Sequence, residues 1–158
     1  TGMLRSAAMA GNDEEVILAA TAVLTDAKVA PELENEARYY RAQSLVKVNQ
    51  MAHAVADWQS LAQDTRNAYG AEAKYQLAQY LFDAGKTAEA EKEVLNYLEV
   101  STPHAYWLAR SFVLLSDIYA KLDRKLEARQ YLLSLKQNYQ ADDDIAGMIE
   151  SRLEKLNE

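Results

Sequence analysis

Apolar and polar residues alternate along this chain with the period of an α-helix. Between residues 32 and 48, the apolar and small side chains fall on one helical face: Leu33, Ala37, Tyr40, Ser44, Leu45 and Val48. No stretch shows the sustained two-residue alternation of a strand bounded by turn residues. The pattern therefore predicts helices throughout, approximately at residues 3–10, 13–26, 32–48, 51–65, 69–84, 87–100, 104–121, 125–138 and 142–156.

Local signals support several of these boundaries. Asn12 is placed to cap the second helix, and Gly85 follows an apolar run where a helix often ends in a left-handed residue. Pro31 and Pro103 both fall between helices, where the missing amide donor does no harm. The acidic run 142–144 precedes the last helix, where carboxylates meet the positive end of the helix dipole.

The helices also repeat in sequence. Ala37, Ala73 and Ala109 stand 36 residues apart, and each is followed by a basic residue. Residues 36–54 align with 72–90, and again, with two extra residues, with 108–128. A repeat of this length indicates stacked supersecondary units, which mostly present a surface rather than a catalytic pocket.

Matched small residues indicate how the helices pair. The first helices carry Ala42, Ala78 and Ser116 at one equivalent place, and the second helices carry Ala54, Ala90 and Ala128. Small side chains let two backbones approach closely, and short connections favour antiparallel pairing. Bulkier residues follow at fixed offsets and are expected to fill the space between pairs: Trp58, Val94, Leu132, Leu61, Tyr97 and Leu135.

This pattern resembles the tetratricopeptide repeat (TPR) family, in which a small and then a large residue precede a turn with Gly or Asn. Four copies can be read: Leu4, Ala7, Gly11, Val16 and Ala20; Ala42, Leu45, Asn49, Ala54 and Trp58; Ala78, Leu81, Gly85, Ala90 and Val94; Ser116, Tyr119, Asp123, Ala128 and Leu132. The first copy is the weakest. The spacing is 36–38 residues rather than the usual 34, and Arg41 stands where the family has an apolar residue.

The resemblance implies an all-α α-solenoid, in which antiparallel helix pairs form a right-handed superhelix. We expect one domain over residues 1–158, with repeats at approximately 3–28, 32–66, 69–101 and 104–139 and a C-terminal capping helix at 142–156. The alternative fold is a helical bundle without superhelical stacking. The last helix carries an apolar stripe that would cap the array or, alternatively, form a dimer contact: Met148, Ile149, Leu153 and Leu156.

In the TPR family the first helices line a concave face that binds a peptide or helix of another protein. Projecting the helical period onto the matched copies then gives the residues of that face, and the expected partner-binding residues are Tyr39, Gln43, Val46, Lys47, Tyr75, Gln79, Phe82, Arg110 and Asp117. The alternative interpretation places these aromatic side chains in the core or at the rim of the solenoid. Some TPR proteins clamp a terminal carboxylate with several cations, but Arg110 alone is cationic at the matching places, which argues against such a clamp.

Composition narrows the choice of partner. The 158 residues carry a formal net charge of −7, with 49% apolar residues and no cysteine. Without a cluster of cations, the chain is not expected to bind nucleic acid or an anionic membrane surface. No apolar run is long enough to predict a membrane span, and no cofactor is predicted.

Catalytic chemistry is not predicted either. His53 and Asp57 have a spacing that could hold a metal ion, but two ligands are too few, so a surface His–Asp pair is expected. Glu89, Glu91 and Glu93 are expected to be solvated, and no phosphate loop or nucleophile motif is present. We therefore expect a protein that is not an enzyme.

The predicted function is a protein–protein interaction scaffold. The alternative is a structural spacer or self-association module of a larger assembly. Because bacterial envelope proteins often carry TPR arrays, the resemblance favours a fragment of a larger bacterial protein, located in the envelope or periplasm if that parent has a signal peptide. The start at Thr1 rather than Met fits the same expectation of a processed or trimmed chain.

Overall fold

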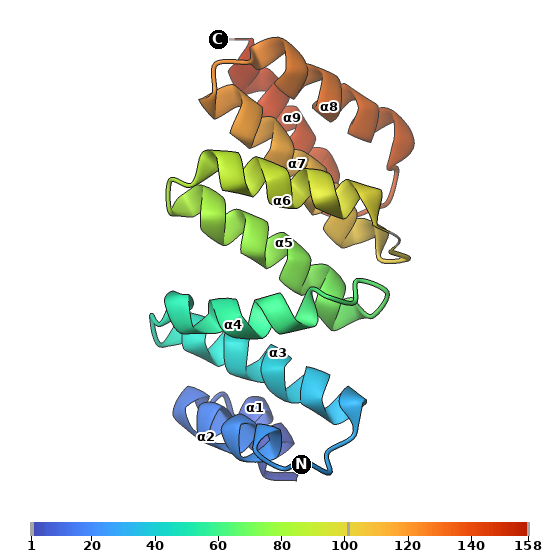
Figure 1. Ribbon diagram of the computed structural model, residues 1–158. Coiled ribbons are helices and arrows are strands. Elements are labelled where there is room, and N and C mark those ends of the chain that lie inside the picture. The colour runs from blue at the N-terminus through green and yellow to red at the C-terminus, as the bar shows by residue number, and fades with distance from the viewer. Residues whose placement is uncertain (1, 101, 158) are drawn as a thin grey trace. The chain divides into compact units, whose positions relative to one another are not determined.

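The computed structural model describes residues 2–100 and 102–157. These residues form nine α-helices and no strand, and consecutive helices pack as antiparallel neighbours (Figure 1). The helices are α1 (Gly2–Ala10), α2 (Asp13–Leu24), α3 (Pro31–Lys47), α4 (Met51–Leu61), α5 (Ala68–Asp83), α6 (Thr87–Glu99), α7 (Ala105–Lys121), α8 (Lys125–Asn138) and α9 (Ile145–Leu156). The predicted domain ends, residues 1 and 158, and the predicted end of the third repeat, residue 101, lie outside the described residues.

Each predicted helix is present, and the largest differences lie at two ends. α4 ends at Leu61 rather than at residue 65, because the Asp64 carboxylate accepts a hydrogen bond from the Arg66 amide at 3.1 Å and forms a turn there. α9 begins at Ile145 rather than at residue 142, because Asp143 Oδ1 accepts the Ile145 amide at 2.9 Å. The acidic run therefore lies before the helix. Asn12 caps α2 as predicted, with its Oδ1 3.2 Å from the Glu15 amide.

The chain divides into two compact units, one ending at Lys74 and the other beginning at Tyr75. α5 crosses this boundary, so its first turns belong to the first unit and the rest of the helix to the second. The first unit also contains α1 to α4, and the second contains α6 to α9.

Four turns, two in each unit, have the same geometry. Each places one residue in the left-handed region: Gly11, Asn49, Gly85 and Asp123, with φ of 71°, 63°, 80° and 61°. In each turn that residue's amide donates three residues back and the next amide donates five residues back, as with Gly85 to Phe82 and Lys86 to Leu81. This is the Schellman motif, which satisfies the last carbonyl groups of the preceding helix. The four helix pairs are therefore joined in the same way, at spacings of 36 or 38 residues.

The matched small residues lie where the helices of each pair meet. The six of them, Ala42, Ala78, Ser116, Ala54, Ala90 and Ala128, are at most 2% exposed. The bulkier residues predicted to fill the space between pairs are also buried. In the second unit, Val94 and Tyr97 of α6 share a core cluster with Leu114 and Leu115 of α7. The packing role predicted from the sequence is therefore confirmed for Val94 and Tyr97.

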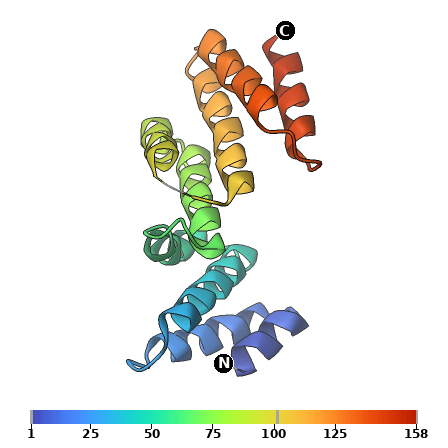
Figure 2. The same cartoon turned by 90° about the vertical axis from the view of Figure 1, so that its right-hand side faces the viewer.

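The first unit has a core of its own between α1, α2 and α3. Its buried residues are Leu4, Ala7, Val16, Ala20 and Ala37. Figure 1 and Figure 2 both show the α1–α2 pair with α3 on one side and no other helix of the described residues of that unit against it. Within the first unit, one side of this pair is therefore uncovered.

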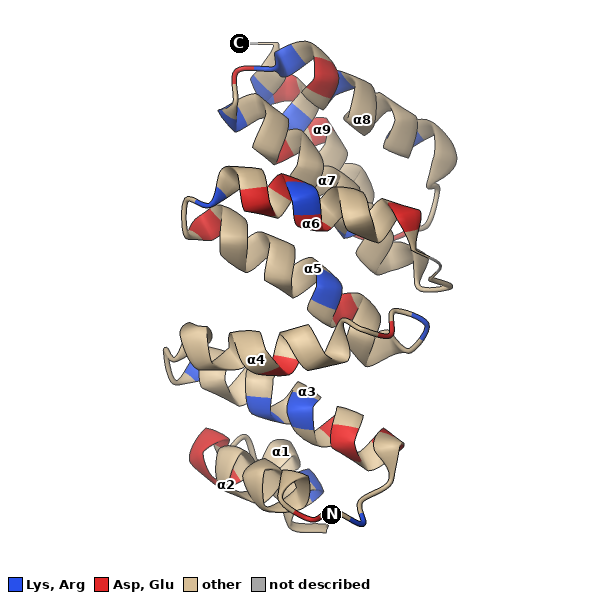
Figure 3. Ribbon diagram, in the orientation of Figure 1, with Lys and Arg blue, Asp and Glu red and all other residues tan. Residues whose placement is uncertain are grey.

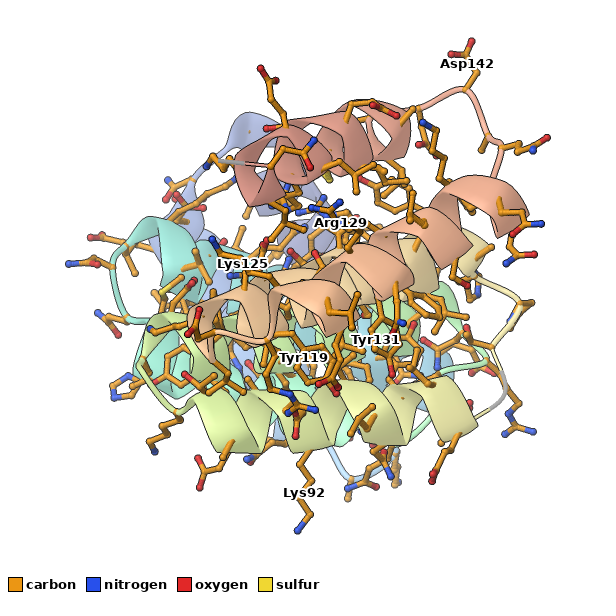
Figure 4. The ribbon with its side chains drawn as sticks, turned by 90° about the horizontal axis from the view of Figure 1, so that it is seen from above. Lys92, Tyr119, Lys125, Arg129, Tyr131 and Asp142 are labelled. Carbon is orange, nitrogen blue, oxygen red and sulfur yellow. The ribbon has the colours of Figure 1, made fainter. Side chains whose placement is uncertain are left out.

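The apolar stripe of α9 packs within the second unit. Ile145 and Ile149 form a buried cluster with Ala109 and Val113 of α7, and Met148, Leu153 and Leu156 pack around it. Arg129 of α8 reaches toward α9, where it donates to Asn157 Oδ1 at 2.9 Å (Figure 4). α9 thus covers the outer side of the α7–α8 pair.

Candidate binding surfaces

The predicted site residues of the first unit lie along one face of α3. Tyr39 connects two helices there, because its hydroxyl donates to Glu72 Oε1 of α5 at 3.2 Å and accepts from Gln43 Nε2 at 2.7 Å. Its ring lies 4.6 Å, centroid to centroid, from that of Tyr69. Burial, followed by the negative charge of Glu72, raises the pKa of Tyr39, so the phenol stays neutral at physiological pH.

Two hollows adjoin this α3 face on the side of α1. One, of about 60 Å³, is lined in part by Gln43, Lys47 and Tyr40. The other, of about 330 Å³, lies against Arg5, Glu36 and Tyr40. Val46 is half-buried and Lys47 is exposed, one turn beyond Gln43. The α3 face therefore presents an amide, a cation and aromatic edges next to open space.

In the second unit, three predicted residues form one hydrogen-bonded row. Arg110 Nη2 of α7 donates to the Tyr75 hydroxyl of α5 at 3.0 Å, and that hydroxyl donates to Gln79 Oε1 at 2.9 Å. Gln79 Nε2 continues the row to Asp83 at 2.8 Å. The structure therefore brings Tyr75, Gln79 and Arg110 together.

Arg110 lies against several aromatic rings. Its guanidinium carbon is 4.9 Å from the centroid of the Tyr75 ring and 5.9 Å from those of Tyr106 and Trp107. Its Nη1 donates to the Tyr106 hydroxyl at 3.0 Å, and that hydroxyl donates in turn to Asp144. Among the described residues, no carboxylate lies within ion-pair distance of Arg110. A guanidinium has five N–H donors, so those that remain can face a ligand.

Burial and the neighbouring polar groups shift the pKa values of this row in opposite directions. Burial works to lower the pKa of Arg110, but the hydroxyl groups of Tyr106 and Tyr75 raise it, and the net change is upward. Burial raises the pKa of Tyr75, and the neighbouring Arg110 charge limits that rise. At physiological pH the row therefore holds a fixed cation beside the neutral phenol of Tyr75.

The remaining predicted residues of the second unit have partners. Lys121 Nζ of α7 lies 5.2 Å from the centroid of the Phe82 ring of α5, a cation–π distance. Asp117 accepts two hydrogen bonds from Arg152 of α9, at 2.8 and 3.1 Å. Because Tyr75–Arg110 and Phe82–Lys121 join similar positions of the two helices, α5 and α7 run side by side in the same direction within this unit.

Not every predicted site residue is a surface residue. Tyr75 is only 5% exposed and its ring belongs to the second unit's core, so its hydroxyl edge is what contributes to the row. Sequence reasoning did not assign Tyr106, Trp107 or Arg152 to this face. Tyr106 could have been found, since it lies four residues before Arg110 and hence on the same side of α7. Arg152 gave no such signal, because only the fold brings α9 beside α7.

Two expectations about acidic residues are wrong. Asp57 does not form a surface pair with His53: it is 3% exposed and binds the Arg41 guanidinium through both oxygens, at 2.8 and 2.6 Å. This pair also accounts for an arginine at a half-buried place of α3. Glu91 is only partly solvated, since its side chain is 26% exposed but its Oε2 is buried and lies 3.6 Å from Arg124 Nη1. The described residues hold no group of three or more His, Asp or Glu side chains that could bind a metal ion.

A third hollow, which the sequence did not suggest, lies at the uncovered side of the α1–α2 pair. Its volume is about 820 Å³, and its lining is mainly apolar: Met3, Leu4, Ala7, Ala19, Val23 and Leu33 contribute to it. The lining also includes Glu15 and Asp26 but no cation. We call it the α1–α2 hollow.

Comparison with protein-family models, with curated proteins and with solved structures found no match for this chain. Within the described part of the chain, no helix has both the length and the apolar character needed to cross a bilayer.

Proposed function

We propose that this protein is a non-catalytic scaffold of TPR-like repeats, stacked as a solenoid, that binds a peptide segment or helix of a partner protein on its first helices. The four identical left-handed turns and the buried small residues support the repeat assignment. Both features recur with the period of the sequence repeat, which a bundle of unrelated helices would not require.

One observation carries the binding proposal, namely the environment of Arg110. A guanidinium that is partly withdrawn from water usually has a carboxylate partner, but Arg110 has two phenol oxygens and three rings instead. An acidic or carboxamide group of a bound segment would complete its hydrogen bonds. Arginine beside tyrosine and tryptophan is also the composition that dominates binding energy in protein interfaces.

The neighbouring groups indicate what such a segment contains. Gln79 offers an adaptable amide beside Arg110, and the half-buried Phe82 offers an apolar surface further along α5. A segment with one acidic side chain followed by an apolar one therefore matches this face. The recognition would be by side chains on a rigid helical surface rather than by strand addition.

The test uses random twelve-residue peptides displayed on phage and selected against the full chain. Peptides that bind the unchanged protein are measured against Arg110→Ala and, as the matched control, Arg129→Ala, another half-buried arginine that lies on the second helix α8. We expect Arg110→Ala to weaken binding about tenfold or more, the range for a hydrogen bond to a charged group, while Arg129→Ala binds normally. Selected peptides that bind Arg110→Ala unchanged, or no selected peptides at all, would contradict the proposal.

A further inference from the structure

The α1–α2 pair and the α7–α8 pair can be compared residue by residue. Gly11 and Asp123 hold the same left-handed place in the same turn, and they fix the register. Counted from that turn, the residues on the uncovered side of the first pair match those of the last as follows: Met3 with Leu115, Ser6 with Ile118, Ala7 with Tyr119, and Ala19 with Tyr131. The two pairs thus present the same face with different side chains.

On the α7–α8 pair this face is covered by α6. Leu115 and Ile118 have no exposed surface and share a cluster with Val94 and Tyr97 of α6. The Tyr119 ring stacks on that of Tyr131, with centroids 5.5 Å apart. Figure 4 shows both rings on the side of the pair that faces α6, while Lys92 of α6 points away from it. A helix therefore fits this face when it carries apolar residues at three- and four-residue spacing.

On the α1–α2 pair the same face is open. Met3 is 80% exposed and Leu18 of α2 is 72% exposed. Where the last pair has two tyrosines, the first has Ala7 and Ala19, and both line the α1–α2 hollow of about 820 Å³. The missing tyrosine rings account for much of the depth of the hollow. Whatever covers this face must bring bulky apolar side chains of its own, because empty apolar space forfeits packing energy.

The charges at the two faces differ. On the last pair, Arg124 pairs with Glu91 of the covering helix and with Glu127 of α8. At the places of Arg124 and Glu127 the first pair has the uncharged Asn12 and Glu15, and Glu15 lines the α1–α2 hollow without a cation beside it in that lining. α2 opens with three carboxylates, of which Asp13 accepts a hydrogen bond from Ser44 of α3 (Figure 3). A covering helix must therefore supply a cation at the place where α6 supplies Glu91. A second copy of this chain meeting the first through this same lining would bring Glu15 and Asp26 but no cation to pair with them.

We propose that the α1–α2 hollow binds an amphipathic helix of a partner protein, placed across α1 and α2 as α6 is placed across α7 and α8. Its apolar face carries large side chains that fill the space above Ala7 and Ala19, and a Lys or Arg meets the acidic start of α2. This surface is separate from the Arg110 row and does not depend on it, so the protein would have two binding sites of different chemistry.

The probe is a synthetic helix with the sequence of residues 86–100 of this chain, since that segment contains the helix that covers the matching face. Val94→Trp in the peptide fills the deeper hollow, and Glu91→Lys supplies the cation. A covalent link between positions 92 and 96, both exposed in the structure, keeps the peptide helical. The control peptide carries Val94→Trp and retains Glu91. Binding of each labelled peptide to the full chain is followed by fluorescence anisotropy.

The protein variants form a matched pair. Leu18→Lys places a charge on the α1–α2 hollow, and Leu126→Lys changes an equally exposed leucine of α8, which is 70% exposed against 72% for Leu18. We expect the Glu91→Lys peptide to bind about tenfold more tightly than its control, the size of one charge-assisted contact. We expect Leu18→Lys to abolish most of that binding and Leu126→Lys to leave it unchanged.

Three results would overturn the proposal. The peptides could fail to bind the unchanged protein, they could bind Leu18→Lys as well as they bind Leu126→Lys, or the acidic peptide could bind as tightly as the cationic one. Sedimentation of the protein without peptide tests whether two copies of the chain associate through this face. A dimer that Leu18→Lys dissociates would show that a second copy, and not a partner helix, covers this face.

Discussion

The α1–α2 pair and the α7–α8 pair are each joined by the same kind of left-handed turn, but they differ in which helices pack against them. In the second unit, α6 and α9 cover both sides of α7–α8, and leucine, isoleucine and tyrosine occupy the contact. In the first unit, one side of α1–α2 is bare, and methionine, serine and alanine occupy the matching places. The difference teaches that a repeat fixes how its two helices pair, whereas the residues on its outer face are fitted to a particular neighbour.

The largest expected effect comes from removing a covered residue. Ile118 has no exposed surface, so Ile118→Ala should lower the free energy of unfolding by about 4 kcal/mol through lost burial and the cavity left behind. Met3→Ala, at an exposed place on the matching face, should change it by less than about 0.5 kcal/mol. Urea unfolding measures both. Trp58 reports on the first unit and Trp107 on the second, so single-tryptophan versions tell which unit is affected.

If Met3→Ala proved as costly as Ile118→Ala, the α1–α2 face would already be covered in solution. In that case the α1–α2 and α7–α8 pairs would both have covered faces, and the α1–α2 face would not be open to a partner.

A second prediction concerns the α3–α4 pair. At the position that matches Met3 and Leu115, this pair has a charged residue that is neither fully exposed nor packed among apolar side chains. Arg41 is the counterpart of Met3 and Leu115, and it joins α3 to Asp57 of α4 and to Thr21 of α2. Asp57→Ala should cost about 3 kcal/mol, because it leaves a partly buried guanidinium without its carboxylate. The double replacement Arg41→Leu with Asp57→Leu should recover most of that loss. Unfolding in urea again gives the values, and a double variant as unstable as Asp57→Ala would contradict this account.

The fold was more predictable from sequence than the surfaces were. Helices, turns and small contact residues obey local rules, so Gly85, Asn12 and Ala90 could be assigned from their neighbours in the chain. Arg41 and Asp57 could not, because a buried ion pair is formed by residues on different helices and each looks like a surface residue alone. The nine predicted site residues were chosen by helical period, which left open whether the aromatic rings face a partner or the core, and the Tyr75 ring proves to be buried. The α1–α2 hollow had no local signal, because alanines at Ala7 and Ala19 look like ordinary packing residues.

The smallest predicted effect is a loss of folding stability at alkaline pH. It is expected for the covered face, which contains Tyr119, and not for the open one. Burial, and then the charge of Glu91, raise the pKa of Tyr119 to about 12, whereas its counterpart Ala7 cannot titrate. A raised folded-state pKa means that the folded protein holds this proton more tightly than the unfolded chain does. The stability that Tyr119 contributes is therefore complete below its unfolded pKa of about 10 and is lost as pH rises through about 12.

Urea unfolding of the second unit, followed through Trp107, should show this loss between about pH 10 and about pH 12. Tyr119→Phe removes the titrating group, and its stability should fall less steeply over the same interval. Equal slopes for the two proteins would mean that Tyr119 titrates normally and that α6 does not shield it.

Amide hydrogen exchange of the full chain, with and without the Glu91→Lys peptide, tests the central claim most directly. We expect α7 and α8 to be protected in the free protein and α1 and α2 to exchange faster, because one outer face is covered and the other is open. Added peptide should slow exchange in α1 and α2 and leave α7 and α8 unchanged. Slow exchange in α1 and α2 of the free protein, or no added protection there when peptide is present, would contradict the account.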